Sequence, residues 1–133
     1  MKHNLVQEKS FELAVAIVRF TRHLEERKEY AISRQLIRSG TSIGANIEEA
    51  IGAESRKDFA HKLLIARKEA RETRFWLKLL QAADNNHATQ IIDILALTED
   101  ILNLLHRITK TLKSQAPKTD QNPNVHPLPL PNL

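Results

Sequence analysis

Four segments of this chain place their apolar side chains at alternating spacings of three and four residues, and this pattern constrains the fold more than any other feature. The segment from about residue 56 to 83 shows it best. Its seam positions are Phe59, Leu63, Ala66, Ala70, Thr73, Leu77 and Leu80. Such spacing gathers side chains onto one face of an α-helix, whereas a strand requires alternation at every second residue. No segment shows that alternation, so the sequence predicts an all-α protein.

The other three segments repeat the signal over about 4–28, 30–53 and 87–114. The first has its seam at Val6, Leu13, Ile17, Phe20 and Leu24, widened by Phe11, Ala14 and Val18. The last has Ile91, Ile94, Thr98, Ile101, Leu105, Ile108 and Leu112. Asn4 with Gln7, and Ser55 with Asp58, have the spacing of helix-start capping boxes. Four amphipathic helices joined by short connections favour an antiparallel up-down four-helix bundle over residues 1–114.

Residues 115–133 differ in composition from the rest of the chain. They hold all five prolines, four of them after residue 122. Proline cannot continue a helix, and the stretch has little to bury. We expect a disordered or extended Pro-rich tail, which could alternatively serve as an extended peptide ligand.

The second helical segment contains an unusual concentration of small residues. Gly40 and Gly44 lie four apart, which lets another backbone approach closely. An apolar seam through Ile43, Ile47 and Ala50 adjoins a polar face of Ser39, Ser42, Asn46 and Glu49. We expect Ser42, Ile43, Gly44, Asn46, Ile47 and Glu49 to form a tight packing point between helices or subunits, with Asn46 and Glu49 reaching across to fix register.

Composition excludes several classes of protein. At 133 residues the chain fits one domain, and it has no cysteine for a disulfide scaffold, a thiolate zinc site or a cysteine nucleophile. The N-terminus lacks a signal-like apolar block, and no apolar run approaches the roughly 20 residues of a membrane span. We expect a soluble cytoplasmic protein that binds no membrane.

Positive charge is concentrated in the third segment. Residues 56–78 contain eight basic and three acidic residues, a net +5, while the rest of the chain carries −1. Arg67, Arg71, Arg74 and Lys78 fall within about 60° on a helical wheel, roughly 100° from the apolar seam. Aligned cations of this kind can track nucleic-acid phosphates. The alternative is an ordinary solvated face, partly neutralised by pairs such as Lys68 with Glu72.

Metal and catalytic motifs are sparse. Asp58-x-x-His61 occurs once, and the other histidines share no ligand spacing, so we expect no metal site and no cofactor. Arg56 and His61 have the Arg-x4-His form of some helical ribonucleases, in which Arg steadies a phosphate and His moves a proton. This two-residue match leaves a ribonuclease as an alternative.

Trp76 shares a flank of the third segment with Ile65 and Leu79. It either anchors a subunit interface or closes the edge of the core.

The run Ser39-Gly40-Thr41-Ser42-Ile43-Gly44-Ala45-Asn46-Ile47-Glu48-Glu49-Ala50, with Ser55-Arg56-Lys57-Asp58-Phe59 and Lys68-Glu69-Ala70-Arg71-Glu72-Thr73, resembles a bacterial family. These are the four-helix-bundle or 23S rRNA-intervening-sequence proteins. The resemblance spans about residues 3–113 and implies an antiparallel bundle that assembles as a homopentamer, without established enzymatic activity. It also implies kinship with the accessory proteins of diversity-generating retroelements, which bind reverse transcriptase and nucleic acid. Many relatives have proline where this chain has Gly44.

These observations together predict a non-enzymatic, self-assembling helical bundle. Its expected partner is RNA or a nucleic-acid-associated, reverse-transcriptase-like protein, bound through the basic face of the third helix. A pure protein–protein scaffold is the alternative from a different class, and a ribonuclease using Arg56 and His61 is the third.

Overall fold

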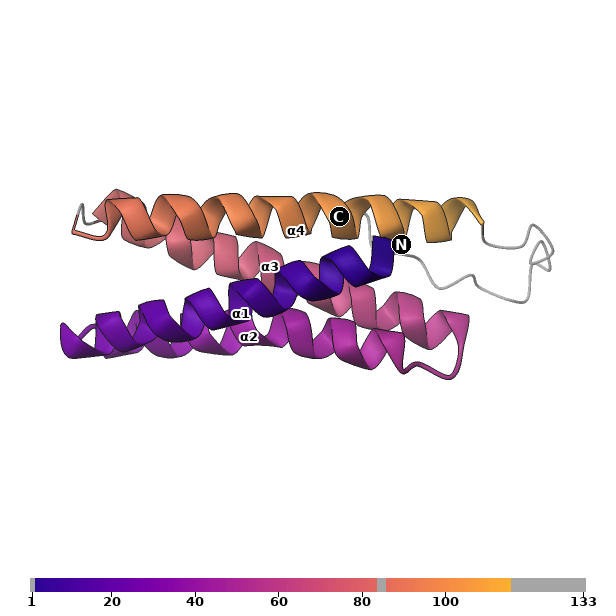
Figure 1. The fold of residues 1–133 in the computed structure, drawn as a ribbon, viewed down its shortest axis with the longest axis horizontal. Coiled ribbons are helices and arrows are strands. Elements are labelled where there is room, and N and C mark those ends of the chain that lie inside the picture. The colour runs from indigo at the N-terminus through magenta and orange to yellow at the C-terminus, as the bar shows by residue number, and fades with distance from the viewer. Residues whose placement is uncertain (1, 84–85, 116–133) are drawn as a thin grey trace, which may run out of the picture.

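The computed structural model of the chain describes residues 2–83 and 86–115, and within them four helices and no strand are present. The helices are α1 (Lys2–Glu26), α2 (Tyr30–Ile51), α3 (Arg56–Ala83) and α4 (Ala88–Ser114). They run alternately in opposite directions as four long rods (Figure 1). The predicted all-α up-down bundle is therefore confirmed. The predicted Pro-rich tail lies outside the described residues, apart from Gln115.

Each helix packs against two neighbours in the cyclic order α1–α2–α3–α4, and the described residues show no packing across either diagonal. The α2–α3 interface is the most extensive and α1–α4 the least. The seam positions of all four segments meet along the bundle axis. The largest fully buried side chains are Leu13, Ile17, Leu24, Leu36, Ile43, Ile47, Leu63, Leu77, Ile91, Ile101 and Leu105, with His87.

One apolar residue expected in the first seam lies outside the core. The Phe11 side chain is 71% exposed. At 100° per residue it lies about 150° from the centre of the α1 seam, so it points away from α2 and α4. The prediction that Phe11 widens the buried stripe is wrong for this reason.

Helix ends follow the sequence signals in part. The Ser55 Oγ accepts a hydrogen bond from the Asp58 backbone N–H at 3.0 Å, which caps α3 as predicted. The capping box predicted at Asn4 is wrong, because α1 already begins at Lys2. At the other end of α1, Lys28 adopts a left-handed φ of 63°, and the Glu29 N–H bonds to the Leu24 carbonyl at 2.9 Å. This Schellman-type ending turns the chain within three residues.

His87 lies immediately before α4 and is buried, which its isolated position in the sequence did not indicate. Its Nε2 lies 3.1 Å from Glu29 Oε2 in the α1–α2 connection. Its ring makes edge-to-face contacts with Phe20, at a centroid distance of 5.6 Å, and with His23, at 5.0 Å. These contacts fasten the start of α4 onto α1 at one end of the bundle.

Candidate nucleic-acid interface

The small-residue segment of α2 packs closely against α1. A Cβ added at Gly40 would lie 2.8 Å from Cγ1 of the buried Ile17 on α1, so only glycine fits there. At Gly44 the nearest atom would be the Ser10 carbonyl oxygen at 3.4 Å, an ordinary van der Waals separation. Helix α2 runs unbroken through both positions, with Ile43 and Ile47 buried in the core. Both glycines face α1, and Gly40 is the more tightly enclosed.

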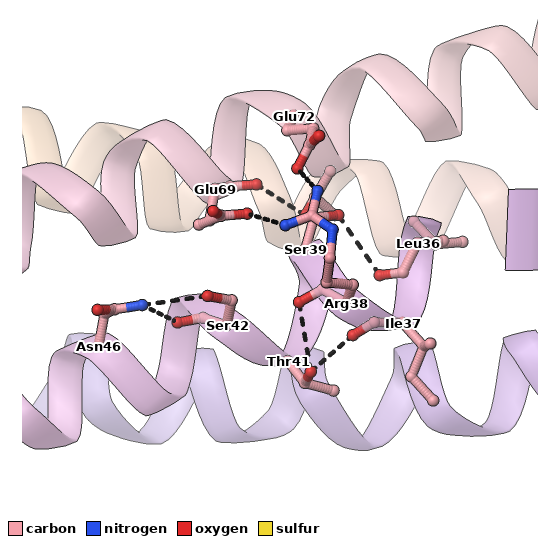
Figure 2. A network of polar contacts seen from close by, with 10 residues as sticks. Leu36, Ile37, Arg38, Ser39, Thr41, Ser42, Asn46, Glu69 and Glu72 are labelled. Atoms are coloured by element: carbon pink, nitrogen blue, oxygen red, sulfur yellow. Dashed lines mark hydrogen bonds and ion pairs between the residues drawn. The ribbon is translucent and has the colours of Figure 1, made fainter. Parts of the chain in front are cut away.

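Among the polar residues of this segment, Asn46 bonds within α2 (Figure 2), whereas Glu49 bonds to another helix. The Asn46 Nδ2 donates to the Ser42 carbonyl oxygen at 2.8 Å and lies 3.1 Å from Ser42 Oγ, both within α2. Asn46 therefore does not reach another helix, contrary to the expectation, because its short side chain is held by its own backbone. Glu49 does reach across, to Lys62 Nζ on α3 at 2.8 Å. This hydrogen bond raises the pKa of the Lys62 ammonium group.

Hydroxyl groups join the neighbouring helices inside the bundle. The Thr73 hydroxyl on α3 lies 2.9 Å from Ser39 Oγ on α2, and both side chains are fully buried. The Ser33 hydroxyl donates to the Thr21 carbonyl of α1 at 3.2 Å. A small hydroxyl at such positions satisfies its own hydrogen bonding without holding the helices apart.

Helix α3 has carboxylates on the side that faces α2, and α2 supplies their counterion. The Arg38 guanidinium bonds Glu69 at 3.2 Å and also Glu72 (Figure 2). The bond to Glu72 is the main reason that the pKa of Arg38 is raised. The expected Lys68–Glu72 pair is therefore replaced by a contact between helices, and the negative charge of α3 is compensated from α2.

Cations dominate the opposite flank of α3, which faces α4. An open hollow of about 240 Å³ lies between the two helices, and its lining residues are Arg67, Arg71, Arg74, Glu99, Leu102, Asn103 and His106. Three of the four basic residues predicted from the helical wheel thus meet in one groove. Lys78 lies one turn beyond, in a neighbouring hollow that it shares with Arg71 and Arg74.

The four cations differ in their partners. Arg74 is ion-paired with Glu99 of α4, with Nη1 3.2 Å from Oε1. The Arg67 Nη2 lies 3.0 Å from His106 Nδ1. Arg71 and Lys78 are exposed and make no ion pair within the described part of the chain. The groove therefore has one carboxylate for three arginines.

Arg67 and His106 each have a property that bears on anion binding. Partial burial, followed by repulsion from Arg71, lowers the pKa of Arg67. Arginine can only donate, so His106 Nδ1 must accept, and a neutral His106 then carries its proton on Nε2. That N–H is directed away from Arg67 and can donate to a ligand. The groove thus offers an anion several donors and uncompensated positive charge.

Sequence inspection did not identify the contribution of α4 to this groove. Glu99, Asn103 and His106 lie on one flank of α4, at spacings of four and three residues beside the buried Leu102 and Leu105. That spacing was available in the sequence. The pairing of this flank with the basic face of α3 required the three-dimensional arrangement.

The remaining predicted residues are placed as follows. Trp76 is half-buried and packs against the core of its own chain. Arg56 bonds Gln115 Oε1 at 3.3 Å. His61 is exposed elsewhere on α3, because the five-residue separation places the two side chains about 140° apart around the helix.

The described residues contain no group of three or more His, Asp or Glu side chains arranged to hold a metal ion. Of the helices described, none combines the length and apolarity required to cross a membrane.

Comparison with known proteins identifies the family. The family model of the 23S rRNA-intervening sequence proteins matches residues 2–107. A solved structure from Bacteroides thetaiotaomicron, described as a protein of unknown function from the S23 ribosomal protein family, is similar with 49% identity and a TM-score of 0.79. That match covers 83% of this chain and 99% of the other. No curated protein matches, and neither description names a catalytic activity. This chain belongs to the family of 23S rRNA-intervening sequence proteins.

Proposed function

We propose that this chain is a non-enzymatic, cytoplasmic RNA-binding bundle whose α3–α4 groove contacts the RNA backbone. The groove brings Arg67, Arg71 and Arg74 together against a single carboxylate, Glu99. This excess of positive charge is the observation that carries the proposal. Arginines with exposed guanidinium groups donate bidentate hydrogen bonds to phosphate oxygens, and their repulsion is relieved when an anion enters. We take RNA as the polyanion to test because the family description refers to 23S rRNA, although that description names no ligand.

We further propose that the chain acts as a homo-oligomer, with a pentamer as the expected state. In a closed ring, each subunit presents its own copy of the groove. Several weak phosphate sites held in fixed positions bind one RNA far more tightly than a single groove does. Light scattering tests this part directly, because a pentamer gives five times the 15.2 kDa mass of the monomer. A monomer at micromolar concentration contradicts it.

The decisive experiment measures RNA affinity as a function of salt concentration. Replacing Arg67, Arg71 and Arg74 together by Ala removes the groove's positive charge and is expected to weaken binding at low salt by about 100-fold or more. The slope of log affinity against log salt should also flatten by about two, since each lost phosphate contact on a single strand contributes roughly 0.7.

A matched control keeps the number of lost charges but moves them. Lys57, Lys68 and Lys110 are exposed and lie outside the groove, so their triple Ala variant should retain most of the affinity. Equal losses in both triple variants would show that binding follows only net charge. If the unmodified protein binds no RNA at low salt but is retained by a reverse-transcriptase-like protein, the partner is a protein and the scaffold alternative holds.

A further inference from the structure

Phe75 is an aromatic side chain that the bundle leaves in solvent. It lies at the centre of the outward face of α3 and is 58% exposed. The other aromatic residues of α3, Phe59 and Trp76, are both partly buried against the core. Apart from a ring contact with Trp76, this phenylalanine adds little to the packing of its own chain.

The surroundings of Phe75 are positively charged. A second open hollow, of about 560 Å³, is lined by Arg71, Glu72, Arg74, Phe75, Trp76 and Lys78. Arg71 precedes Phe75 by four residues and Lys78 follows it by three, so the two cations flank the ring by one helical turn on each side. The Glu72 carboxylate is engaged by Arg38. An aromatic platform therefore lies between two cations that have no carboxylate partner within the described residues.

Trp76 fixes the position of this platform. The Phe75 and Trp76 rings meet edge to face, with centroids 5.1 Å apart and an interplanar angle of 70°. Because Trp76 itself packs against the core, the contact restricts Phe75 from one side. A ring that is already held loses less entropy when a ligand stacks on it.

Only one class of polyanion matches this pattern of groups. Phosphates separated by about two helical turns, roughly 10 Å, would meet Arg71 and Lys78, and a flat apolar group between them would meet Phe75. A single-stranded nucleic acid offers both, and RNA is the one that the proposed function names, whereas a duplex keeps the faces of its bases stacked inside. An acidic peptide supplies charge without the flat rings.

We propose that Phe75 stacks an unpaired base of single-stranded RNA while Arg71 and Lys78 hold the adjacent phosphates. This inference rests on the proposed RNA binding and specifies its substrate as unpaired RNA. It extends the interface from the α3–α4 groove onto the outward face of α3.

The test compares a 12-nucleotide single strand with the same sequence in a duplex, using fluorescence anisotropy on the full chain. Phe75→Ala should weaken single-strand binding by about fivefold or more, since each stacked base contributes on that scale, and change duplex binding by less than about twofold. Phe75→Tyr preserves a stacking ring and should restore single-strand affinity. Trp76 is the only tryptophan, so its fluorescence should change when the single strand binds.

Several results would overturn the inference. The first is an unchanged single-strand affinity in Phe75→Ala, and the second is an unmodified protein that binds the duplex as tightly as the single strand. The third is a change of oligomer mass in Phe75→Ala, which would place the ring between two copies of the chain. Loss of affinity in Arg71→Ala with none in Phe75→Ala would leave the proposed function standing and remove this inference alone. Absence of binding to either RNA would remove the proposed function itself.

Discussion

The two flanks of α3 have opposite charge arrangements although they belong to one helix. On the flank facing α2, Glu69 and Glu72 are both engaged by Arg38. On the flank facing α4, three arginines share Glu99 alone. The α2–α3 interface is also the more extensive of the two. The first flank is internally compensated, and the second is left open to a ligand.

This difference shows how a chain of modest net charge can present a strongly basic surface. The net charge of +4 by itself does not indicate nucleic-acid binding. The carboxylates of α3 are sorted toward one neighbour and its arginines toward the other. A surface potential therefore depends on which charges the fold pairs internally, and substitutions of Arg71, Arg38 and Glu99 test this reading.

The largest expected effect comes from reversing one charge on each flank. Arg71→Glu places a carboxylate in the open groove and should weaken RNA binding by roughly 10- to 100-fold through repulsion of phosphate. Arg38→Glu makes the same charge change on the α2 flank and should weaken binding by only a few fold. Affinities at one fixed low salt concentration compare the two, and similar losses would remove the distinction between the flanks.

The close packing around α2 is tested at its two glycines. Gly40→Ala forces a methyl group against the buried Ile17 and should lower the free energy of unfolding by about 1–2 kcal/mol, after a helix-propensity gain of up to about 1 kcal/mol. Gly44→Ala keeps the same gain with an ordinary contact and should be neutral or slightly stabilising. Urea denaturation measures both, and equal effects would contradict the asymmetry between the two sites.

The buried hydroxyl pair between α2 and α3 should have a smaller effect. Thr73→Val leaves the Ser39 hydroxyl without its partner on α3 and should cost about 1 kcal/mol of stability. Ser39→Ala should cost a similar amount or less, because the Thr73 hydroxyl that it leaves behind still donates to the Glu69 carbonyl oxygen at 2.8 Å. In the double variant the two losses should fall short of additivity by about 0.5 kcal/mol. Additive losses would show that the hydroxyls act independently.

The smallest effect is expected at the single carboxylate of the open groove. Glu99→Gln removes the partner of Arg74 and should raise RNA affinity by about two- to fivefold. Stability should change by less than about 1 kcal/mol, because both side chains are partly exposed, at 32% for Arg74 and 43% for Glu99. Isothermal calorimetry measures the first and thermal unfolding the second. Weaker RNA binding would indicate that Glu99 orients Arg74 for the ligand.

Most of the fold could be predicted because helical periodicity is a local property. The spacing that placed Leu63, Leu77 and Ile101 on seams also placed them at 0–2% exposure in the core. The error at Phe11 arose because this apolar residue was assigned to the buried stripe without regard to its angular position around the helix. His87 was missed for a different reason, since its burial depends on Phe20, His23 and Glu29, which are distant in the sequence.

Only the α3 side of the candidate interface could be predicted from the sequence. A helical wheel aligned Arg67, Arg71 and Arg74, because they share one helix. It could not show that Arg38 takes the carboxylates of α3 or that His106 faces Arg67, since both facts depend on which helices are neighbours. Long side chains of opposite charge also have several partners within reach, and the fold decides among them.

The cyclic order of the helices bears on how the chain folds. Three of the four interfaces join helices that are consecutive in sequence, and only the least extensive one, α1–α4, joins the two ends of the bundle. Chains dominated by such local contacts reach the native state quickly, within roughly microseconds to milliseconds. Since α1 and α4 are farthest apart in sequence, we expect their docking, with His87 against Glu29, to be the last long-range step of folding.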